Sequence, residues 1–567
     1  MTPFATLETP GGFPMPELPK RTDNRGFVNN QENDVDYCVR QVILQKDWTI
    51  QIYDDDAIQN WSKQSWSCSN ENDAVLSYAV QECRWRHKQW QKDRDIGTPA
   101  AICKAGLVLA KDGLGQELRA SIMGDLKTLQ QNEEESGVST MARHPKYKKI
   151  HHLVHPSLYA YEKGVTHVLP EVGAEAVSAP SWNTFLGFDG VVNADKPLRP
   201  DVDGARNDSC YGRNYHGTEV ESPTAAECSL HQWMPSEFFV ASSSSASSAS
   251  TCQINSYINN LHPIKYEGLY NKIGELFLET LPMMEEVLSE VNDNGKVRKQ
   301  LPRFESETRP QGRGRSRFSP QKKIEEPPIP SFVPPKYTAK KKAVSLHDRP
   351  LQVIVKVISM ELQPLEPDYA SMTEDEKDAY ADLPVEEKPQ YFPGGHWHVE
   401  GTRDERIVAS ACCYLDSENV TEKGLEFRNG SVGSIGRELG TVETSPGRIL
   451  VWPNYLHHKT GGVSLKDKKR AGHRTLCCFH LVDPTLRIRS TATVPPQQRS
   501  WLWSMANNLA LAPLPSDGLV RSKIHDFMVS DGSTISYEEA LERRERLSRE
   551  RWGDARVIAD NFWIPCD

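Results

Sequence analysis

From Leu351 onward the sequence is a series of short apolar runs separated by turn residues, and this pattern constrains the fold more than any other feature. The first run, 351–362, is rich in Val and Ile, which favour strands over helices. The later runs are 396–400, 407–415, 425–429, 440–444, 448–451 and 474–482. Many short strands at regular spacing are typical of a sandwich or a jelly roll, so we predict a jelly-roll domain here.

The residues before this domain show the apolar spacing of helices instead. Helical periodicity is found over 38–48, 54–66, 73–90, 115–133 and 268–291. Near the C-terminus, 537–552 form one more predicted helix, whose dense Glu and Arg pairs favour a solvated face. We therefore predict an α+β fold with a jelly-roll core, a largely helical N-terminal region and a C-terminal helix.

Composition sets the expected boundaries between these parts. Segments rich in Pro, Gly, Ser or charge cannot bury enough apolar surface to fold alone. The predicted segments are a disordered N-terminus (1–33), a mainly helical region (34–295) with loop insertions at 185–228 and 241–251, a disordered basic and Pro-rich linker (296–345), the jelly-roll domain (346–500) and a C-terminal helical extension (501–567).

The segment 393–401 carries the first candidate metal ligands. His398 and Glu400 are two residues apart, and on a strand this spacing places both side chains on the same face. An imidazole and a carboxylate on one face are two thirds of a facial 2-His-1-carboxylate iron site. Such a site leaves coordination positions open for oxygen and a co-substrate.

The third ligand and a contact to the co-substrate are expected farther along the chain. His457 and His458 follow Pro453, and either could complete the site. Arg474, sixteen residues beyond His458, could hold a dicarboxylate by its bidentate fork. With 17 histidines and 77 acidic residues in 567 positions, chance alone places an acid two residues after a histidine about twice. The prediction therefore depends on the ordered set and not on the pair alone.

Composition also bears on partners and location. The net charge of −10 at pH 7 makes nucleic-acid binding unlikely for the whole chain, although the basic residues 309–342 of the linker leave one weak route. No stretch is apolar over the length that spans a bilayer, so we expect no membrane association. The 12 cysteines lack CxxC spacing and suit a reducing compartment, which favours an intracellular protein, cytoplasmic by default, with the nucleus not excluded.

Several sequence blocks resemble a fungal family catalogued only as a domain of unknown function. The blocks are LVHPSLY (153–159), SYINNLHP (256–263), LQVIVK (351–356), WHVEG (397–401), ENVTE (418–422), VDP (482–484) and STATVPPQ (490–497). They cover most of the chain, from about residue 34 to its end. The family is grouped with double-stranded β-helix oxygenases through the same metal motif, so the resemblance implies this jelly-roll form for the core.

The resemblance also implies roles for individual residues. The metal pattern of the family falls on His398, Glu400 and His458, because the family usually has glutamine where His457 stands. His457 then points to the opposite face of its strand. His396, where the family commonly has a small residue, is expected beside the metal ligands without binding the metal.

Contacts to the co-substrate follow from the same resemblance. Arg474 matches the arginine that grips the distal carboxylate of 2-oxoglutarate in many such enzymes. Those enzymes often carry Ser or Thr two residues later, whereas this chain has Leu476. The second contact must therefore come from elsewhere, and Tyr414 and Asn419 are the candidates.

These observations predict an oxygenase with Fe(II) and 2-oxoglutarate as cofactors, which hydroxylates or otherwise oxidises an unidentified substrate. Two alternatives stay open: a non-redox cupin-like metal protein and an interaction scaffold. The first would not need Arg474, since it has no co-substrate carboxylate to clamp. The second would not depend on His398.

Overall fold

The computed structural model describes sixteen stretches of the chain. They are residues 30–45, 47–64, 72–90, 97–103, 106–136, 141–145, 147–168, 230–242, 250–292, 328–334, 344–365, 369–384, 387–421, 424–429, 437–501 and 534–552. The predicted N-terminal segment up to residue 29, the loop insertion 185–228, the middle of the insertion 241–251, most of the linker 296–345 and most of the extension 501–567 lie outside these residues.

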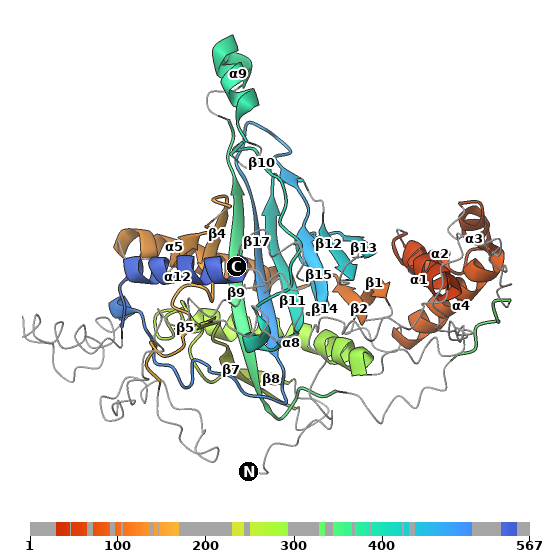
Figure 1. The fold of residues 1–567 in the computed structure, drawn as a ribbon, viewed down its shortest axis with the longest axis horizontal. Coiled ribbons are helices and arrows are strands. Elements are labelled where there is room, and N and C mark those ends of the chain that lie inside the picture. Colours follow the sequence, from red (N-terminus) through yellow and green to blue (C-terminus); the bar gives the residue numbers. More distant parts are fainter. Residues whose placement is uncertain are drawn as a thin grey trace, which may run out of the picture.

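One large antiparallel sheet dominates the structure (Figure 1). Its strands lie in the order β1-β2-β14-β11-β17-β9-β4-β3, while β7 pairs with β8 and with β9. The bounds are Thr98–Cys103 (β1), Gly106–Lys111 (β2), Ala142–Arg143 (β3), Ile150–Val154 (β4), Ser236–Ala241 (β7), Thr251–Ile254 (β8), Pro350–Leu362 (β9), Ile407–Glu418 (β11), Ile449–Pro453 (β14) and Gly472–Val482 (β17). The long apolar run predicted at 351–362 is therefore confirmed as a strand, β9.

Shorter strands form a second layer. Three of them pair in the order β13-β12-β15, and β10 pairs with β16. Their bounds are Tyr391–Phe392 (β10), Leu425–Asn429 (β12), Arg437–Val442 (β13), Leu456–Thr460 (β15) and Val463–Ser464 (β16). The remaining strands are Tyr161–Glu162 (β5) and His231–Gln232 (β6), and they form a separate two-stranded sheet.

An apolar cluster joins the two layers. It contains Tyr414 of β11, Trp452 of β14 and Cys478 of β17 together with Phe427 of β12 and Leu456 of β15. We call the side of the large sheet that contacts this cluster the inner face. Because side chains alternate along a strand, every second residue of the central strands points to this face.

The opposite side of the large sheet, the outer face, is covered by helix α8 (Glu267–Asn292). Phe479 of β17 packs edge to face against Phe277 of α8, with ring centroids 5.4 Å apart. The cluster around them also takes in Val355 of β9 and Cys477 of β17. This apolar layer is the main core of the molecule.

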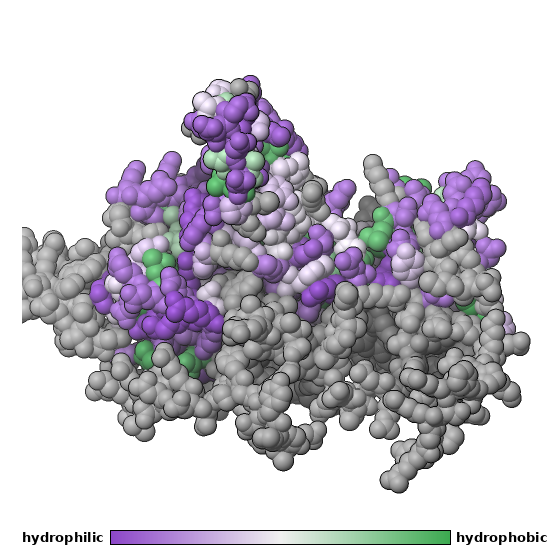
Figure 2. Space-filling view, turned by 45° about the horizontal axis from the view of Figure 1, so that its top comes forward, coloured by the Kyte–Doolittle hydropathy of each residue, from purple (hydrophilic) through white to green (hydrophobic). Residues whose placement is uncertain are grey.

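The other helices lie around the sheets. Their bounds are Asn30–Ile43 (α1), Trp48–Gln51 (α2), Asp55–Ser62 (α3), Asn72–Trp90 (α4), Gln116–Ser136 (α5), Glu374–Asp382 (α9) and Tyr537–Trp552 (α12), with short 3-10 turns at Tyr369–Ser371 (η5) and Arg403–Glu405 (η6). Helix α9 projects from the end of the sheet (Figure 1), and its surface is largely hydrophilic (Figure 2). None of the helices in the described ranges has the length and apolar character that crossing a membrane requires.

The predicted α+β class is confirmed, since helices combine with antiparallel sheets. The predicted helices at 73–90, 115–133, 268–291 and 537–552 correspond to α4, α5, α8 and α12. The mainly helical region 34–295, however, also contributes strands β1–β4, β7 and β8 to the same large sheet as β9 and β11. These strands have six residues or fewer, which is too short for a clear alternating pattern.

Candidate metal centre

The three predicted ligands lie on two segments that meet through the backbone. His458 belongs to β15, and His398 forms an isolated antiparallel bridge with it. The amide of His398 donates to the carbonyl of His458 at 3.1 Å, and the reverse bond measures 2.9 Å. Residues 396–400 are not the continuous strand that we predicted, because their pairing with β15 is limited to this isolated bridge. The bridge brings the two imidazoles together, with ring centroids 4.3 Å apart.

One oxygen of Glu400 faces both histidines. Its Oε1 lies 3.3 Å from Nε2 of His458 and 3.8 Å from Nε2 of His398. The ligand atoms of the three residues lie within 4.8 Å of one another, and no other such group of His, Cys, Asp or Glu is found in the described part of the chain. Bonds of about 2.0–2.2 Å, as for zinc, place the ligand atoms of one ion roughly 3 Å apart. The three side chains are therefore close to the spacing that a bound cation requires.

The other oxygen of Glu400 faces two residues that sequence reasoning missed. Lys356 of β9 places its Nζ 3.3 Å from Oε2, and His480 of β17 places its Nε2 3.6 Å from the same oxygen. Both side chains are buried on the inner face. A signal was present in the sequence, since each is a polar residue with apolar residues on both sides, and burial of such a residue is costly without a partner.

The electrostatics of the centre favour an ionised carboxylate and neutral imidazoles. Burial alone would raise the pKa of Glu400, but the charge of Lys356 and the neighbouring histidines hold it well below its usual value. Burial lowers the pKa of His458 to about 4, with a further lowering by His398. Deprotonated carboxylate and neutral imidazole are the forms that bind a metal.

Further hydrogen bonds orient the ligands. Nδ1 of His398 lies 2.7 Å from the carbonyl oxygen of His396, which leaves Nε2 as the atom available to a metal. Asn454 holds the backbone of Glu400 from both sides, accepting from its amide at 3.0 Å and donating to its carbonyl at 2.8 Å. Ser410 lies 3.0 Å from Nδ1 of His480 and so orients that ring toward Glu400.

The two histidines next to the predicted ligands, His396 and His457, differ in their burial and in their contacts. The side chain of His396 is exposed, with its ring 5.9 Å from that of Tyr147, and it is the backbone carbonyl that contacts His398. His457 is buried beside His458, but its Nδ1 accepts from Arg428 at 3.3 Å on the side of β15 that faces away from the centre. His458, not His457, therefore points at Glu400.

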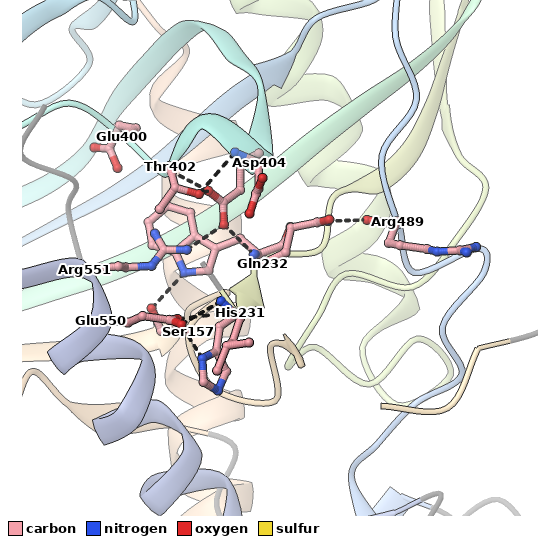
Figure 3. A network of polar contacts seen from close by, with 12 residues as sticks. Ser157, His231, Gln232, Glu400, Thr402, Asp404, Arg489, Glu550 and Arg551 are labelled. Carbon is pink, nitrogen blue, oxygen red and sulfur yellow. Dashed lines mark hydrogen bonds and ion pairs between the residues drawn. The ribbon is translucent and has the colours of Figure 1, made fainter. Parts of the chain in front are cut away.

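The turn that follows Glu400 is fastened to the C-terminal helix. Glu405 accepts from the guanidinium of Arg551 of α12 at 2.6 Å and from the amide of Trp233 at 2.8 Å. Figure 3 shows this network of polar contacts, with Arg551 and Thr402 labelled. Glu405 also accepts from Thr402, and Gly401 has a positive φ of 66° that favours glycine. Arg551 and Glu405 are both buried, so the solvated face predicted for 537–552 is wrong at this position.

Trp233 links this ion pair to the metal centre. The guanidinium of Arg551 lies 4.1 Å from the centroid of the indole, and Nζ of Lys356 lies 5.6 Å from it. The ring of His480 stacks on the same indole, with centroids 6.4 Å apart. The C-terminal helix thus contacts, through one fully buried tryptophan, both residues that hold Oε2 of Glu400.

Of the three residues predicted to contact a co-substrate, Arg474 and Tyr414 share the inner face, whereas Asn419 is held by a loop. Arg474 is buried and, by strand alternation, points to the inner face together with His480. Tyr414 lies in the inner cluster and is close enough to Arg474 for its pKa, raised chiefly by burial, to be lowered slightly by that charge. Asn419 instead donates to the carbonyls of Asp467 and Arg470 and accepts from the amide of Asp467. Its amide group is thus engaged by that loop.

Comparisons with known proteins place the chain in a family. The model of a family described as Protein of unknown function (DUF4246) matches residues 73–374, 384–435 and 430–505. No curated protein matches the sequence.

Solved structures give only distant likenesses. IDO from Bacillus thuringiensis is 7% identical over 24% of this chain and 46% of its own, with a TM-score of 0.16. The Fe(II)/α-ketoglutarate-dependent dioxygenase TqaL is 11% identical over 26% and 50%, with a TM-score of 0.16. An oxidoreductase of the 2OG-Fe(II) oxygenase family from Burkholderia pseudomallei is 10% identical over 25% and 48%, with a TM-score of 0.14. This chain spans half or less of each of these structures, and TM-scores this low carry no argument.

Proposed function

The chain belongs to this family of proteins of unknown function, and we propose that it is a non-haem Fe(II) oxygenase that uses 2-oxoglutarate. The observation that carries the proposal is the convergence of the ligand atoms of His398, Glu400 and His458 within 4.8 Å, next to Lys356 and His480 of the inner face. Two imidazoles and one carboxylate are the donor set of non-haem iron oxygenases, and they leave positions open for a co-substrate and dioxygen.

We also propose that the two sheets form a double-stranded β-helix. Along the chain the strands alternate between layers: β9, β11, β14 and β17 lie in the large sheet, and the strands between them lie in the smaller sheets. Two antiparallel layers joined in this alternating way are the architecture of a jelly roll. In this arrangement the metal ligands lie between the layers, at one end of the inner cluster.

Fe(II) suits the donor set because both histidines present Nε2 toward an ionised carboxylate. Lys356 and His480 hold Oε2 of Glu400, so that only Oε1 faces His398 and His458. Binding through one oxygen would keep the other coordination positions free. Lys356 and His480 are thus positioning residues, which orient a ligand without binding the metal themselves.

Arg474 is the residue that we propose for the distal carboxylate of 2-oxoglutarate. It is buried and points to the inner face, and its guanidinium donates to the carbonyl of Thr421 at 3.3 Å. A guanidinium has five N–H donors in a planar fork, so it can serve this carbonyl and a carboxylate together. Tyr414 is the proposed neighbour that shapes this end of the site, whereas Asn419 is committed to the loop at 467–470.

When bound, the iron and 2-oxoglutarate would supply the oxidising chemistry, and the protein residues would position them and limit solvent access. Glu400 and His458 are buried, whereas the side chain of His398 is 16% exposed. The exposed edge of His398 marks the side from which a substrate would approach. Hydroxylation or a related oxidation is the proposed outcome.

Anaerobic spectroscopy tests the proposal directly. Fe(II) and then 2-oxoglutarate are added to metal-free protein, and the visible charge-transfer band of the chelated co-substrate is recorded. We expect the band in the unaltered protein, its loss in His398→Ala and its weakening in Arg474→Ala. His457→Ala is the matched control, since it removes an imidazole from the opposite side of the same strand, and it should keep the band.

Two results would contradict the proposal. Metal binding without a band would favour a non-redox cupin-like metal protein, for which Arg474 has no carboxylate to clamp. Folded protein that binds neither Fe(II) nor Co(II) would favour an interaction scaffold in which the centre is inert.

A further inference from the structure

Four cysteines form two cross-strand pairs on the central strands β11 and β17. Cys412 lies directly opposite Cys478, and Cys413 lies directly opposite Cys477. In antiparallel strands the Cα atoms of opposite residues are about 4.5–5.5 Å apart, within the roughly 4.4–6.8 Å that a disulfide spans. The backbone therefore allows a cross-link at both pairs.

The two pairs differ in the direction of their side chains. Cys412 and Cys478 point to the inner face, and their sulfur atoms are 2.7 Å apart. Cys413 and Cys477 point to the outer face among the residues that pack on α8. No sulfur–sulfur contact is found for this second pair, although both residues lie in the described part of the chain.

The inner pair lies next to the metal centre. Cys478 is opposite Lys356 across β9 and two residues from His480, and both of these side chains contact Oε2 of Glu400. Cys412 is two residues from Ser410, which lies 3.0 Å from the imidazole of His480. Both thiols are therefore only two residues along a strand from side chains that lie at the candidate centre. An oxidant released at the metal would reach them at short range.

We propose that Cys412 and Cys478 are a redox-active pair that hydrogen peroxide converts into a cross-strand disulfide. One sulfur attacks peroxide, so that an S–O bond forms, the O–O bond breaks, and the thiol proton leaves with the departing oxygen as water. The second thiol then attacks the sulfenic sulfur, the S–S bond forms, and a second water leaves. Two thiols lose two electrons and two protons, and one peroxide becomes two waters.

Because the two cysteines are buried, an oxidant formed inside the protein reaches them more readily than one from solution. The hydrogen bond to Cys478 and burial hold the pKa of Cys412 well above its ordinary value, so its reaction with peroxide from bulk solution is slow and needs an excess of the reagent. Peroxide would instead arise beside the pair if Fe(II) held by His398, Glu400 and His458 were oxidised by dioxygen without a substrate, with two Fe(II) becoming Fe(III) for each dioxygen that takes up two protons. This source of peroxide depends on the proposed oxygenase function, but the closure of the pair does not.

Peptide mapping of the full-length protein tests the closure. Reduced, metal-free protein is treated with hydrogen peroxide, denatured in the presence of an alkylating reagent, digested, and analysed for cross-linked peptides by mass spectrometry. We expect a cross-link in the unaltered protein, its loss in Cys478→Ser and its retention in Cys477→Ser, the matched control one residue away. If Cys478→Ser does not fold, as judged by circular dichroism, Cys412→Ala replaces it.

A cross-link that persists in Cys478→Ser would overturn the proposal. So would unaltered protein whose Cys412 stays a thiol or becomes a sulfinic acid without cross-linking.

A second arm separates the closure from the metal chemistry. Fe(II), 2-oxoglutarate and air replace the added peroxide, and the cross-link should form in the unaltered protein but not in His458→Ala. Added peroxide should still close the pair in His458→Ala. Closure with added peroxide but not with Fe(II) and air would support the redox pair and count against the proposed oxygenase function.

Discussion

The inner and outer faces of strands β9, β11 and β17 carry very different side chains on the same backbone. Outward residues such as Val355 and Phe479 are apolar and pack on α8. Inward residues include Lys356, Ser410 and His480, which surround Glu400 directly or through one hydrogen bond. On each strand, apolar residues of the outer face thus alternate with residues of the inner face. Near the proposed metal ligands these inner-face residues are polar.

The contrast shows where stability and function are located. Apolar burial stabilises by about 25 cal/mol per Å², and the part of the outer face around Phe479 follows this rule. Buried charges and imidazoles cost free energy unless they are paired, and they add little net stability when they are. Stability therefore does not account for the polar residues of the inner face, whereas the proposed metal would.

The largest expected effect comes from removing a proposed metal ligand. His458→Ala leaves one imidazole and one carboxylate, so binding of Fe(II) or Co(II), measured by calorimetry, should be lost. His457→Ala should bind the metal as the unaltered protein does, since its ring faces Arg428 on the other side of β15. Loss of binding in both variants would contradict the division of β15 into two faces.

An outer-face variant should show the opposite behaviour. Phe479→Ala removes a fully buried ring that packs on Phe277, so we expect a loss of about 3–5 kcal/mol in the free energy of unfolding. Denaturant titration of the metal-free protein measures this loss. The affinity of the folded variant for metal should not change, and a weaker affinity at unchanged stability would break the comparison.

Lys356→Met tests whether the inner face is arranged around a cation. Without the ammonium group the buried carboxylate of Glu400 loses its charged partner, and the metal-free protein should lose about 2–3 kcal/mol of unfolding free energy. A bound metal supplies a replacement charge. Thermal unfolding with and without metal should therefore show a larger metal-induced rise in Tm for the variant than for the unaltered protein. An equal rise in both would show that Lys356 does not balance the charge of Glu400 that a metal would balance.

His480→Ala addresses the residue that orients Glu400 from β17. Its imidazole contacts Oε2 and not the proposed metal-binding oxygen, so metal affinity should fall by about 10–100-fold without being lost. Competition with a chromophoric chelator measures the change. Phe479→Ala, one residue away on the outer face, controls for disturbance of β17, and an unchanged affinity in His480→Ala would remove its positioning role.

The smallest effect is expected from His396→Ala. The ring is exposed, and the contact to His398 comes from the backbone carbonyl, which alanine retains. Both the free energy of unfolding and the metal-binding free energy should change by less than about 0.5 kcal/mol. A tenfold weaker affinity would instead assign the ring of His396 to the centre.

Much of the β-structure could be predicted because alternation and turn residues are local signals. The strands at 351–362, 407–415, 425–429 and 474–482 correspond to β9, β11, β12 and β17. Strands β1, β2 and β4 were missed because they are short and lie among helices. The buried position of Arg551 was missed because helix α12 looks solvated in isolation, and only its packing against Trp233 and Glu405 buries this charge.

The residues of the candidate centre also divide into those that the sequence revealed and those that it did not. His398, Glu400 and His458 stood out in the sequence because their residue types and order match one donor set. Lys356 and His480 did not, since a single polar residue in an apolar strand does not reveal its partner. Their common target, Glu400, is 44 residues from one in the sequence, and only the pairing of β17 with β9 brings the two side chains to the same oxygen.

The sequence by itself determined the strand-rich core, the main helices and a candidate donor set of His398, Glu400 and one histidine of the pair 457–458. These follow from periodicity and residue chemistry, which act over a few neighbouring positions. The tertiary structure decided which histidine of the adjacent pair faces Glu400, which residues hold its second oxygen, and which cysteines meet. Those outcomes depend on strand register and on which sheet face is buried, and both are set by contacts between segments far apart in the chain.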